Sequence, residues 1–143
     1  MTDELNEPTA QKATNRQQTV GQLERSISQK IQALYKQHLA HQPSKVTCQL
    51  FYNKMAVIIE NTITQPEPLL MEEGKMDLAE QVRSDLHEAI RPQIKALIEE
   101  ILDVQVLDLL SDARISTART GIIAMLSKTP EVRNPEALSK SKK

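Results

Sequence analysis

The sequence predicts an α+β fold in which a duplicated helix–strand–strand unit forms a four-stranded antiparallel sheet with two long helices on one face. The first observation is a repeat, because the apolar pattern of the run from Lys75 to Leu102 occurs once before, 63 positions earlier in the 143-residue chain. The matched positions are Leu23, Ile27, Ile31, Ala33, Leu34 and Leu39 in the first copy and Leu86, Ile90, Ile94, Ala96, Leu97 and Leu102 in the second. The second observation is that each run precedes two extended apolar segments joined by a turn. Two such units can bury their helices against a single sheet.

The length of the chain suits one domain with one core. We expect this domain to span residues 20–128, with repeats at about 20–61 and 75–128. Residues 1–19 are polar without apolar periodicity and predict a flexible arm, and residues 129–143 predict a disordered tail.

In the first repeat we predict a helix from Gly21 to Ala40, which ends before Pro43 because proline disfavours a helical conformation in the preceding residue. A hairpin follows, with its turn at Asn53-Lys54 and with Leu50 opposite Val57. Inward residues alternate with outward ones. The predicted inward residues are Val46, Cys48, Leu50, Tyr52, Met55, Val57 and Ile59, and the outward apolar ones are Phe51, Ala56 and Ile58.

In the connector from Thr62 to Gly74, two prolines favour a short helix and the glycine favours its end. We predict that the second long helix is kinked or split at Pro92, which cannot donate to the carbonyl of Glu88. Its predicted buried stripe consists of Leu78, Val82, Leu86, Ile90, Ile94, Leu97 and Ile101.

The second hairpin is predicted from an extended segment at Val104–Leu110, a polar loop at 111–120 and a doubly buried strand at 121–126. Since burying a lone carboxylate is costly, Asp108 is placed away from the helices, which leaves Leu107 and Leu109 inward.

An apolar patch on the far face of the sheet predicts self-association. Phe51, Ala56 and Ile58 would lie exposed there on a monomer, so we expect a homodimer or a protein partner that covers them.

Composition and charge narrow the function classes. The chain has one cysteine, two tyrosines, one phenylalanine and no tryptophan, so we expect a reducing compartment and no nucleic-acid binding by base stacking. No apolar run is long enough to span a bilayer, and the start of the chain lacks a secretory signal, which predicts a cytoplasmic protein. Bases predominate from Ala13 to Lys54 and acids from Met55 to Arg119, so the halves attract each other or the first half offers a basic face.

Candidate chemistry is sparse. Arg83, near an apolar stripe, requires a partner, and with Asp112, Arg114 and Arg119 it makes the best candidate ligand or anion site. His38, His41 and Cys48 have a spacing that suggests metal ligation, but the thiol should face the aliphatic core, so no metal site is predicted. The neighbouring acids of the second helix are expected on a solvated face, so no catalytic residue and no cofactor is predicted.

From Gly21 to Leu126 the chain resembles the MpsC-like family, named for a sodium-translocating, membrane-potential-generating system. The motifs that carry the resemblance are His41-Gln42-Pro43-Ser44-Lys45-Val46, Ile63-Thr64-Gln65-Pro66-Glu67, Gly74 with Leu78, Val82-Arg83 and Leu86, and Ser111-Asp112. The resemblance implies an accessory role beside a membrane system for cation or inorganic-carbon transport. We therefore expect a non-enzymatic interaction module, and as the alternative a small-ligand or anion sensor.

Overall fold

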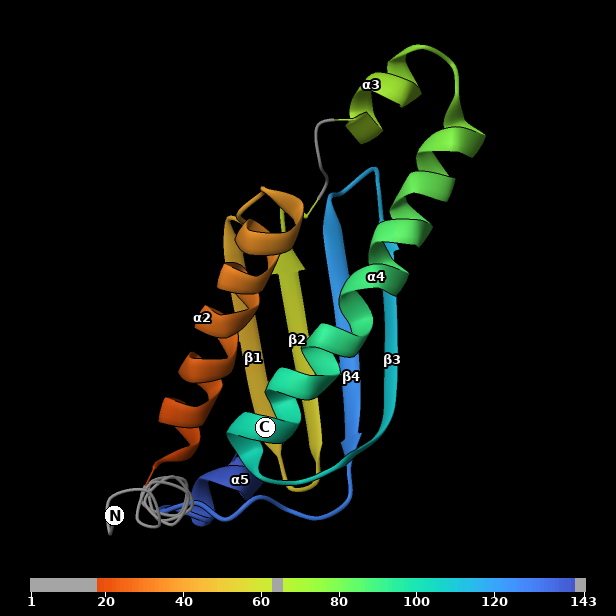
Figure 1. Ribbon diagram of the computed structural model, residues 1–143. Helices are drawn as coiled ribbons and strands as arrows, with labels where there is room; N and C mark the ends of the chain where they lie inside the picture. The colour runs from red at the N-terminus through yellow and green to blue at the C-terminus, as the bar shows by residue number, and fades with distance from the viewer. Residues whose placement is uncertain (1–17, 63–65, 141–143) are drawn as a thin grey trace, which may run out of the picture.

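The computed structural model describes residues 18–62 and 66–140. The flexible N-terminal segment predicted over residues 1–19 therefore lies almost wholly outside the described residues. The chain is of the α+β class, with one four-stranded antiparallel sheet (Figure 1). Its elements are α2 (Val20–Leu39), β1 (Lys45–Phe51), β2 (Lys54–Glu60), α3 (Pro66–Glu72), α4 (Met76–Leu102), β3 (Val106–Arg114), β4 (Arg119–Leu126) and α5 (Glu136–Lys140).

The ends of the long helices have local causes. At the start of α2, the Thr19 side chain accepts from the backbone N–H of Gln22, whose side chain accepts in turn from the backbone of Thr19. This reciprocal capping satisfies two N–H groups that the first helical turn leaves without partners. Ala40 ends α2 and Asp103 ends α4, each in the left-handed conformation with φ of 53° and 55°. Pro92 lies inside α4 without splitting it into two elements.

The strand order is β1-β2-β4-β3, which places the second strand of each hairpin at the centre. The predicted turn at Asn53-Lys54 is wrong by one residue, because Phe51 pairs with Lys54 and the turn consists of Tyr52 and Asn53. The Asn53 carbonyl accepts from the N–H of Leu126 at 2.8 Å, so β4 holds the turn in this position. Leu50 therefore pairs with Met55, and the pairing shifts by two positions, which leaves the faces of the other predicted strand residues unchanged. The inward placement of Tyr52 is wrong, because Tyr52 lies in the turn with a φ of 57° and is 38 % exposed.

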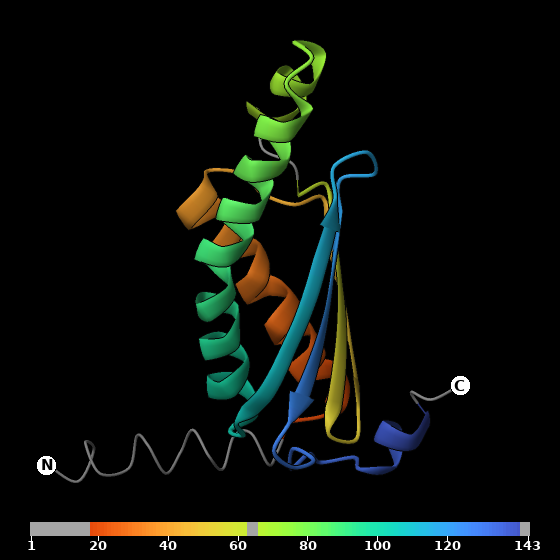
Figure 2. The same cartoon turned by 90° about the vertical axis from the view of Figure 1, so that its right-hand side faces the viewer.

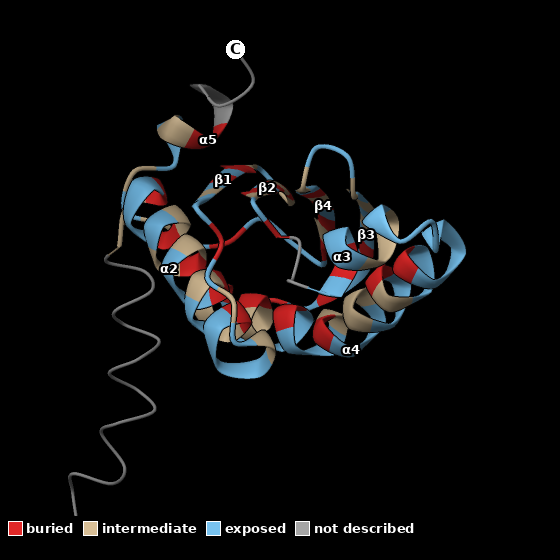
Figure 3. Cartoon of the chain, turned by 90° about the horizontal axis from the view of Figure 1, so that it is seen from above, coloured by how far each residue is buried: buried red, intermediate tan, exposed pale blue. Residues whose placement is uncertain are grey.

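The core lies between the sheet and the two long helices. α2 packs on β1 and on α4, and α4 packs on β3. Figure 2 shows α2 and α4 beside the sheet on the same side, and Figure 3 shows that their buried residues face it. The buried hydrophobic residues of these elements are Val20, Leu23, Ile27, Ile31, Tyr35, Cys48, Leu50, Met55, Val57, Ile59, Ala79, Ile90, Ile94, Ile98, Leu102, Val106, Leu109, Ile122, Ala124 and Leu126.

The predicted stripe of α4 is wrong in its first half. Leu78 is 49 % exposed, whereas Ala79 and Arg83 are buried. The reason is tertiary, because α3 and the first turns of α4 project beyond the end of the sheet, where no strand can cover an apolar stripe (Figure 1). We call residues 66–85, which comprise α3, the short connection after it and the first turns of α4, the arm.

The second hairpin also differs from its prediction. The predicted loop at 111–120 is wrong, because β3 runs to Arg114 and only residues 115–118 form the turn. A register shift between Val106 and Asp108 places Val106 inward and leaves Leu107 68 % exposed, so the inward placement of Leu107 is wrong. Leu109 is buried and Asp108 exposed, as predicted.

The segment after Lys128 contacts the rest of the domain as far as it is described, and it ends in the short helix α5. Arg133 donates its backbone N–H to the Gln18 carbonyl at 2.8 Å, and the Asn134 side chain accepts from the N–H of Val20 at 2.9 Å. Leu138 on α5 is buried, and α5 contacts β1. A local signal in the sequence could have predicted this contact, because the apolar residues Val132 and Leu138 flank Asn134, a residue type that often caps helices.

Side chains cover both edges of the sheet. The Glu24 carboxylate accepts from the backbone N–H of Leu50 on β1 at 2.7 Å, and burial raises its pKa while this hydrogen bond opposes the rise. On β3, Glu99 accepts from the N–H of Val106 at 2.9 Å, and Arg91 donates to the carbonyl of Leu109. These contacts occupy backbone groups that could otherwise pair with a strand of another chain.

Candidate functional site

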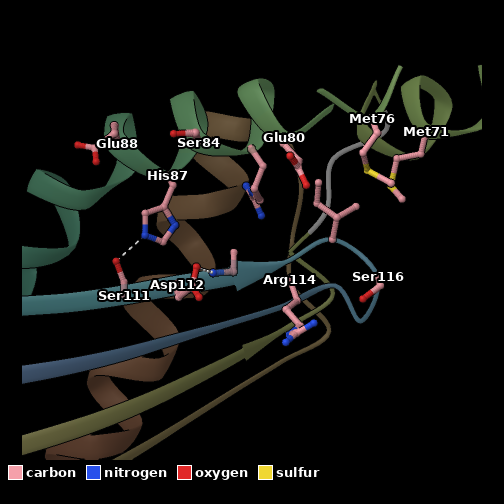
Figure 4. A pocket seen from close by; sticks show the side chains of 13 residues that line it. Met71, Met76, Glu80, Ser84, His87, Glu88, Ser111, Asp112, Arg114 and Ser116 are labelled. Atoms are coloured by element: carbon pink, nitrogen blue, oxygen red, sulfur yellow. Dashed lines mark hydrogen bonds between the residues drawn. The ribbon is translucent and has the colours of Figure 1, made fainter. Parts of the chain in front are cut away.

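A cleft of about 560 Å³ lies between the first half of α4 and the β3–β4 hairpin (Figure 4). The α4 side chains that line it recur at positions three and four apart, so they share one face of the helix. The lining residues are Met71, Met76, Glu80, Arg83, Ser84, His87, Glu88, Ser111, Asp112, Ala113, Arg114, Ile115 and Ser116.

At the base of the cleft lies a buried ion pair. The Arg83 Nε and the Glu67 Oε1 are 3.2 Å apart, and the two side chains are 8 % and 0 % exposed. Bringing two charges out of water carries a large desolvation penalty, so neither would be buried without the other. The partner that the sequence requires for Arg83 is therefore Glu67, from the first turn of α3.

Buried hydroxyls extend this pair into the sheet. The Arg83 guanidinium donates to both the carbonyl and the Oγ1 of Thr62, each at 3.3 Å. The Oγ1 of Thr62 lies 3.1 Å from the Oγ1 of Thr120 on β4, and burial raises the pKa of Tyr35, which also hydrogen-bonds Thr120. The network therefore ties the base of the arm to β4 and α2.

His87 and Ser111 connect the two walls of the cleft. The His87 Nε2 hydrogen-bonds the Ser111 Oγ, from α4 to β3. Burial lowers the pKa of His87, and the positive charge of Arg83 lowers it further. A neutral imidazole beside a serine hydroxyl is the pairing that nucleophilic catalysis uses.

The charges around this pair do not favour such catalysis. Acyl transfer develops an oxyanion, which enzymes stabilise with hydrogen-bond donors or cations. The walls here carry the carboxylates of Glu80, Glu88 and Asp112 near His87. These groups repel a developing negative charge. The His87–Ser111 hydrogen bond links α4 to β3.

The structure brings together three of the four residues predicted for a ligand site. Arg83, Asp112 and Arg114 line the cleft, but Arg119 does not. The Nε of Arg119 is 3.7 Å from the Oε1 of Glu60, in a salt bridge whose side chains are 61 % and 36 % exposed. Arg114 and Arg119 are cross-strand partners next to the β3–β4 turn, where a loop was predicted, and only Arg114 lines the cleft.

Sequence reasoning missed Glu67 and His87 as site residues. Glu67 lies in the connector, where an acidic side chain is expected to face water. The signal that could have identified it is that a guanidinium near an apolar stripe needs a counter-charge, which points to the nearby acids. His87 is adjacent in sequence to the predicted stripe residue Leu86, and only the packing of α4 on β3 brings it to Ser111.

The sequence cluster of His38, His41 and Cys48 is dispersed. His38 is exposed, and the His41 Nε2 is 2.7 Å from the carbonyl oxygen of Asn61. Cys48 is buried, and its pKa lies well above the usual range, first because of burial and then because of the nearby Glu24. Across residues 18–62 and 66–140 no three His, Cys, Asp or Glu side chains come close enough to hold a metal ion.

A family model described as "Na+-translocating membrane potential-generating system (MpsC)" matches residues 19–128. No curated protein and no solved structure matches the chain. In the described part of the chain, none of the helices combines the length and the apolar character needed to cross a bilayer.

Proposed function

Because the chain belongs to the MpsC family, we propose that it is a non-enzymatic accessory module that acts in the cytoplasm beside a membrane system for cation or inorganic-carbon transport. It works by binding proteins: a second copy of itself and a component of that system. The observation that carries this proposal is the face of the sheet opposite the helices.

This outer face is apolar and open at its centre. Ile58, Leu110 and Ile123 are 45 %, 54 % and 40 % exposed. Leu110 pairs with Ile123, and Ile123 pairs with Ala56, so these three side chains form one row across three strands. Ile58 lies in the adjacent row, where it pairs with Gly121. Charged side chains surround these rows. They belong to Lys45, Lys54, Glu60, Asp108, Arg114 and Arg119. An apolar centre within a polar rim is the usual anatomy of a protein interface.

The covered edges support association through this face. Glu24 of α2 already binds a backbone group of β1, and Glu99 and Arg91 of α4 bind backbone groups of β3. Two copies would therefore meet face to face, with Phe51, Ala56 and Ile58 in the interface, in a twofold homodimer in which each copy offers the same patch.

A charge at the centre of the face tests the proposal. Ile58→Lys should convert the dimer into a monomer in sedimentation equilibrium, because the lysine would be buried without a partner. The matched control is Ala33→Lys, which adds the same charge at an exposed position of α2. A wild-type chain that is monomeric at high concentration would refute the dimer.

The membrane system is tested in the native cells. Tagged protein at its endogenous level, purified separately from membrane and soluble fractions, should recover a membrane complex, and Ile58→Lys should lose it while circular dichroism shows an intact fold. Recovery of no membrane component with the wild-type chain would count against the accessory role.

The second candidate function is a small-ligand or anion sensor. The specific observation that favours it is the cleft that brings Arg83, Asp112 and Arg114 together. A ligand bound only by the native state raises the melting temperature. A thermal-shift screen with nucleotides, bicarbonate and phosphate therefore tests it, and Arg114→Gln should abolish any shift.

We also infer that the domain arose from two copies of one unit. The left-handed residues that end α2 and α4, Ala40 and Asp103, are 63 positions apart, like the matched apolar positions. Ile58 pairs with Gly121, again 63 apart, as expected where a local twofold axis crosses two equivalent strands. On this view the arm is an insertion between the copies, since α4 begins seven residues before the position equivalent to Val20, the first residue of α2.

A further inference from the structure

The cleft carries a net negative charge where a ligand would enter. Glu67 neutralises the charge of Arg83 at the base. The remaining charged groups of the lining are the exposed carboxylates of Glu80, Glu88 and Asp112 and the guanidinium of Arg114. Three carboxylates against one guanidinium favour a cation over an anion.

The arm continues this acidic character. Glu72, Glu73, Asp77 and Asp85 are exposed on it, against the single exposed base Lys75. Two arms would repel each other, so a second copy is not the partner of this surface. An anionic lipid surface is disfavoured for the same reason.

Apolar side chains lie among these charges. Met71, Met76 and Ile115 line the outer end of the cleft, and Met76 is 46 % exposed. On the arm, Leu69 and Leu78 are 59 % and 49 % exposed. Flexible methionines adapt to varied apolar partners, and they also pack against the alkyl stems of lysine and arginine. The surface therefore combines carboxylates for positive groups with apolar contacts beside them.

We propose that the cleft and the arm bind a basic, amphipathic segment of a partner protein, with its lysine or arginine heads on Glu80, Glu88 and Asp112 and its apolar side chains on Met76 and the neighbouring arm. This rests on the proposed function and specifies the chemistry of the partner. Segments of this kind are frequent next to membrane spans, because cytoplasmic loops of membrane proteins are enriched in lysine and arginine.

A pair of synthetic peptides tests the proposal on the full chain. The probe is an amphipathic helical peptide of lysine and leucine, and its counterpart carries glutamate at every lysine position. The lysine peptide should bind in calorimetric titration and shift the backbone amide NMR signals of Ser84, His87 and Ser111, while the glutamate peptide should do neither. Binding of both peptides, or shifts confined to the outer face of the sheet, would overturn the proposal.

Matched triple variants separate the cleft from general electrostatics. The triple variant Glu80→Gln, Glu88→Gln and Asp112→Asn should weaken binding of the lysine peptide about tenfold, since each exposed ion pair changes affinity by a factor of roughly 1.5 to 5. The control variant Glu100→Gln, Asp103→Asn and Glu131→Gln removes the same charge at exposed positions outside both the cleft and the arm, and it should weaken peptide binding less than about threefold. Equal weakening by both variants would overturn the site.

A third probe distinguishes a peptide from a small cation. Spermidine should bind far more weakly than the lysine peptide, because it lacks the apolar side chains. Equal affinity would assign the cleft to a small polyamine and overturn the peptide proposal. A wild-type chain that does not bind the lysine peptide but still recovers a membrane complex from its native cells would refute this inference alone and leave the accessory role intact.

Discussion

Removing either member of the Glu67–Arg83 pair should destabilise the domain strongly. Glu67→Gln keeps the size and the acceptor of the side chain but leaves the buried guanidinium without a counter-charge, and Arg83→Met keeps the stem but leaves the carboxylate alone. Both side chains lie almost wholly out of solvent. Breaking a buried pair in this way costs about 3–5 kcal/mol, a large part of the roughly 5–15 kcal/mol by which domains are stable.

The effect should be coupled between the two residues. The double variant leaves no buried charge, so it should lose less than the sum of the single variants, with a coupling energy of about 1–3 kcal/mol. The long contacts of 3.3 Å from Arg83 to Thr62 place the expectation for Arg83→Met toward the lower end of the range.

Urea unfolding followed by circular dichroism measures these free energies. The same cycle on the exposed pair, Glu60→Gln with Arg119→Met, serves as the control and should change the free energy of unfolding by about 0–1 kcal/mol. If the single variants at Glu67 and Arg83 each cost less than about 1 kcal/mol, or if their effects simply add, the pair does not hold the arm to the domain as described.

Three further predictions test the fold and the site. The folded state lowers the pKa of His87 below the ordinary value of about 6.5, so the unfolded chain binds more protons there. Stability should therefore fall as the pH is lowered from about 7 to about 5, and His87→Gln should flatten this dependence. An unchanged slope in the variant would contradict the assignment. The raised pKa of the Cys48 thiol predicts slow alkylation of the native protein and fast alkylation in urea, and equal rates would show an open core. Leu138→Ala should lower the free energy of unfolding by about 2 kcal/mol, against no change for Thr129→Ala, and a neutral Leu138→Ala would show that α5 does not dock.

The cleft could be predicted only in part. Arg83 stood out because a guanidinium near an apolar stripe requires a partner, and Asp112 and Arg114 were expected in the polar loop of the second hairpin. Glu67 and His87 could not be assigned, since their roles depend on contacts between elements that the sequence does not align. The charge of the site also depends on tertiary contacts: basic residues near Asp112 suggested an anion, whereas in the fold Glu67 neutralises Arg83 and Arg119 pairs with Glu60 outside the cleft lining.

The sequence by itself determined the two long helices and the inward faces of β1 and β2, because these follow from the period of the apolar residues and from local signals such as Pro43. Side-chain direction survived even the two-position register error at Leu50, since strand faces alternate with a period of two. The tertiary structure alone decided the order β1-β2-β4-β3, the docking of α5 and the projection of the arm. These depend on contacts between residues far apart in the chain, whose energies no local pattern records.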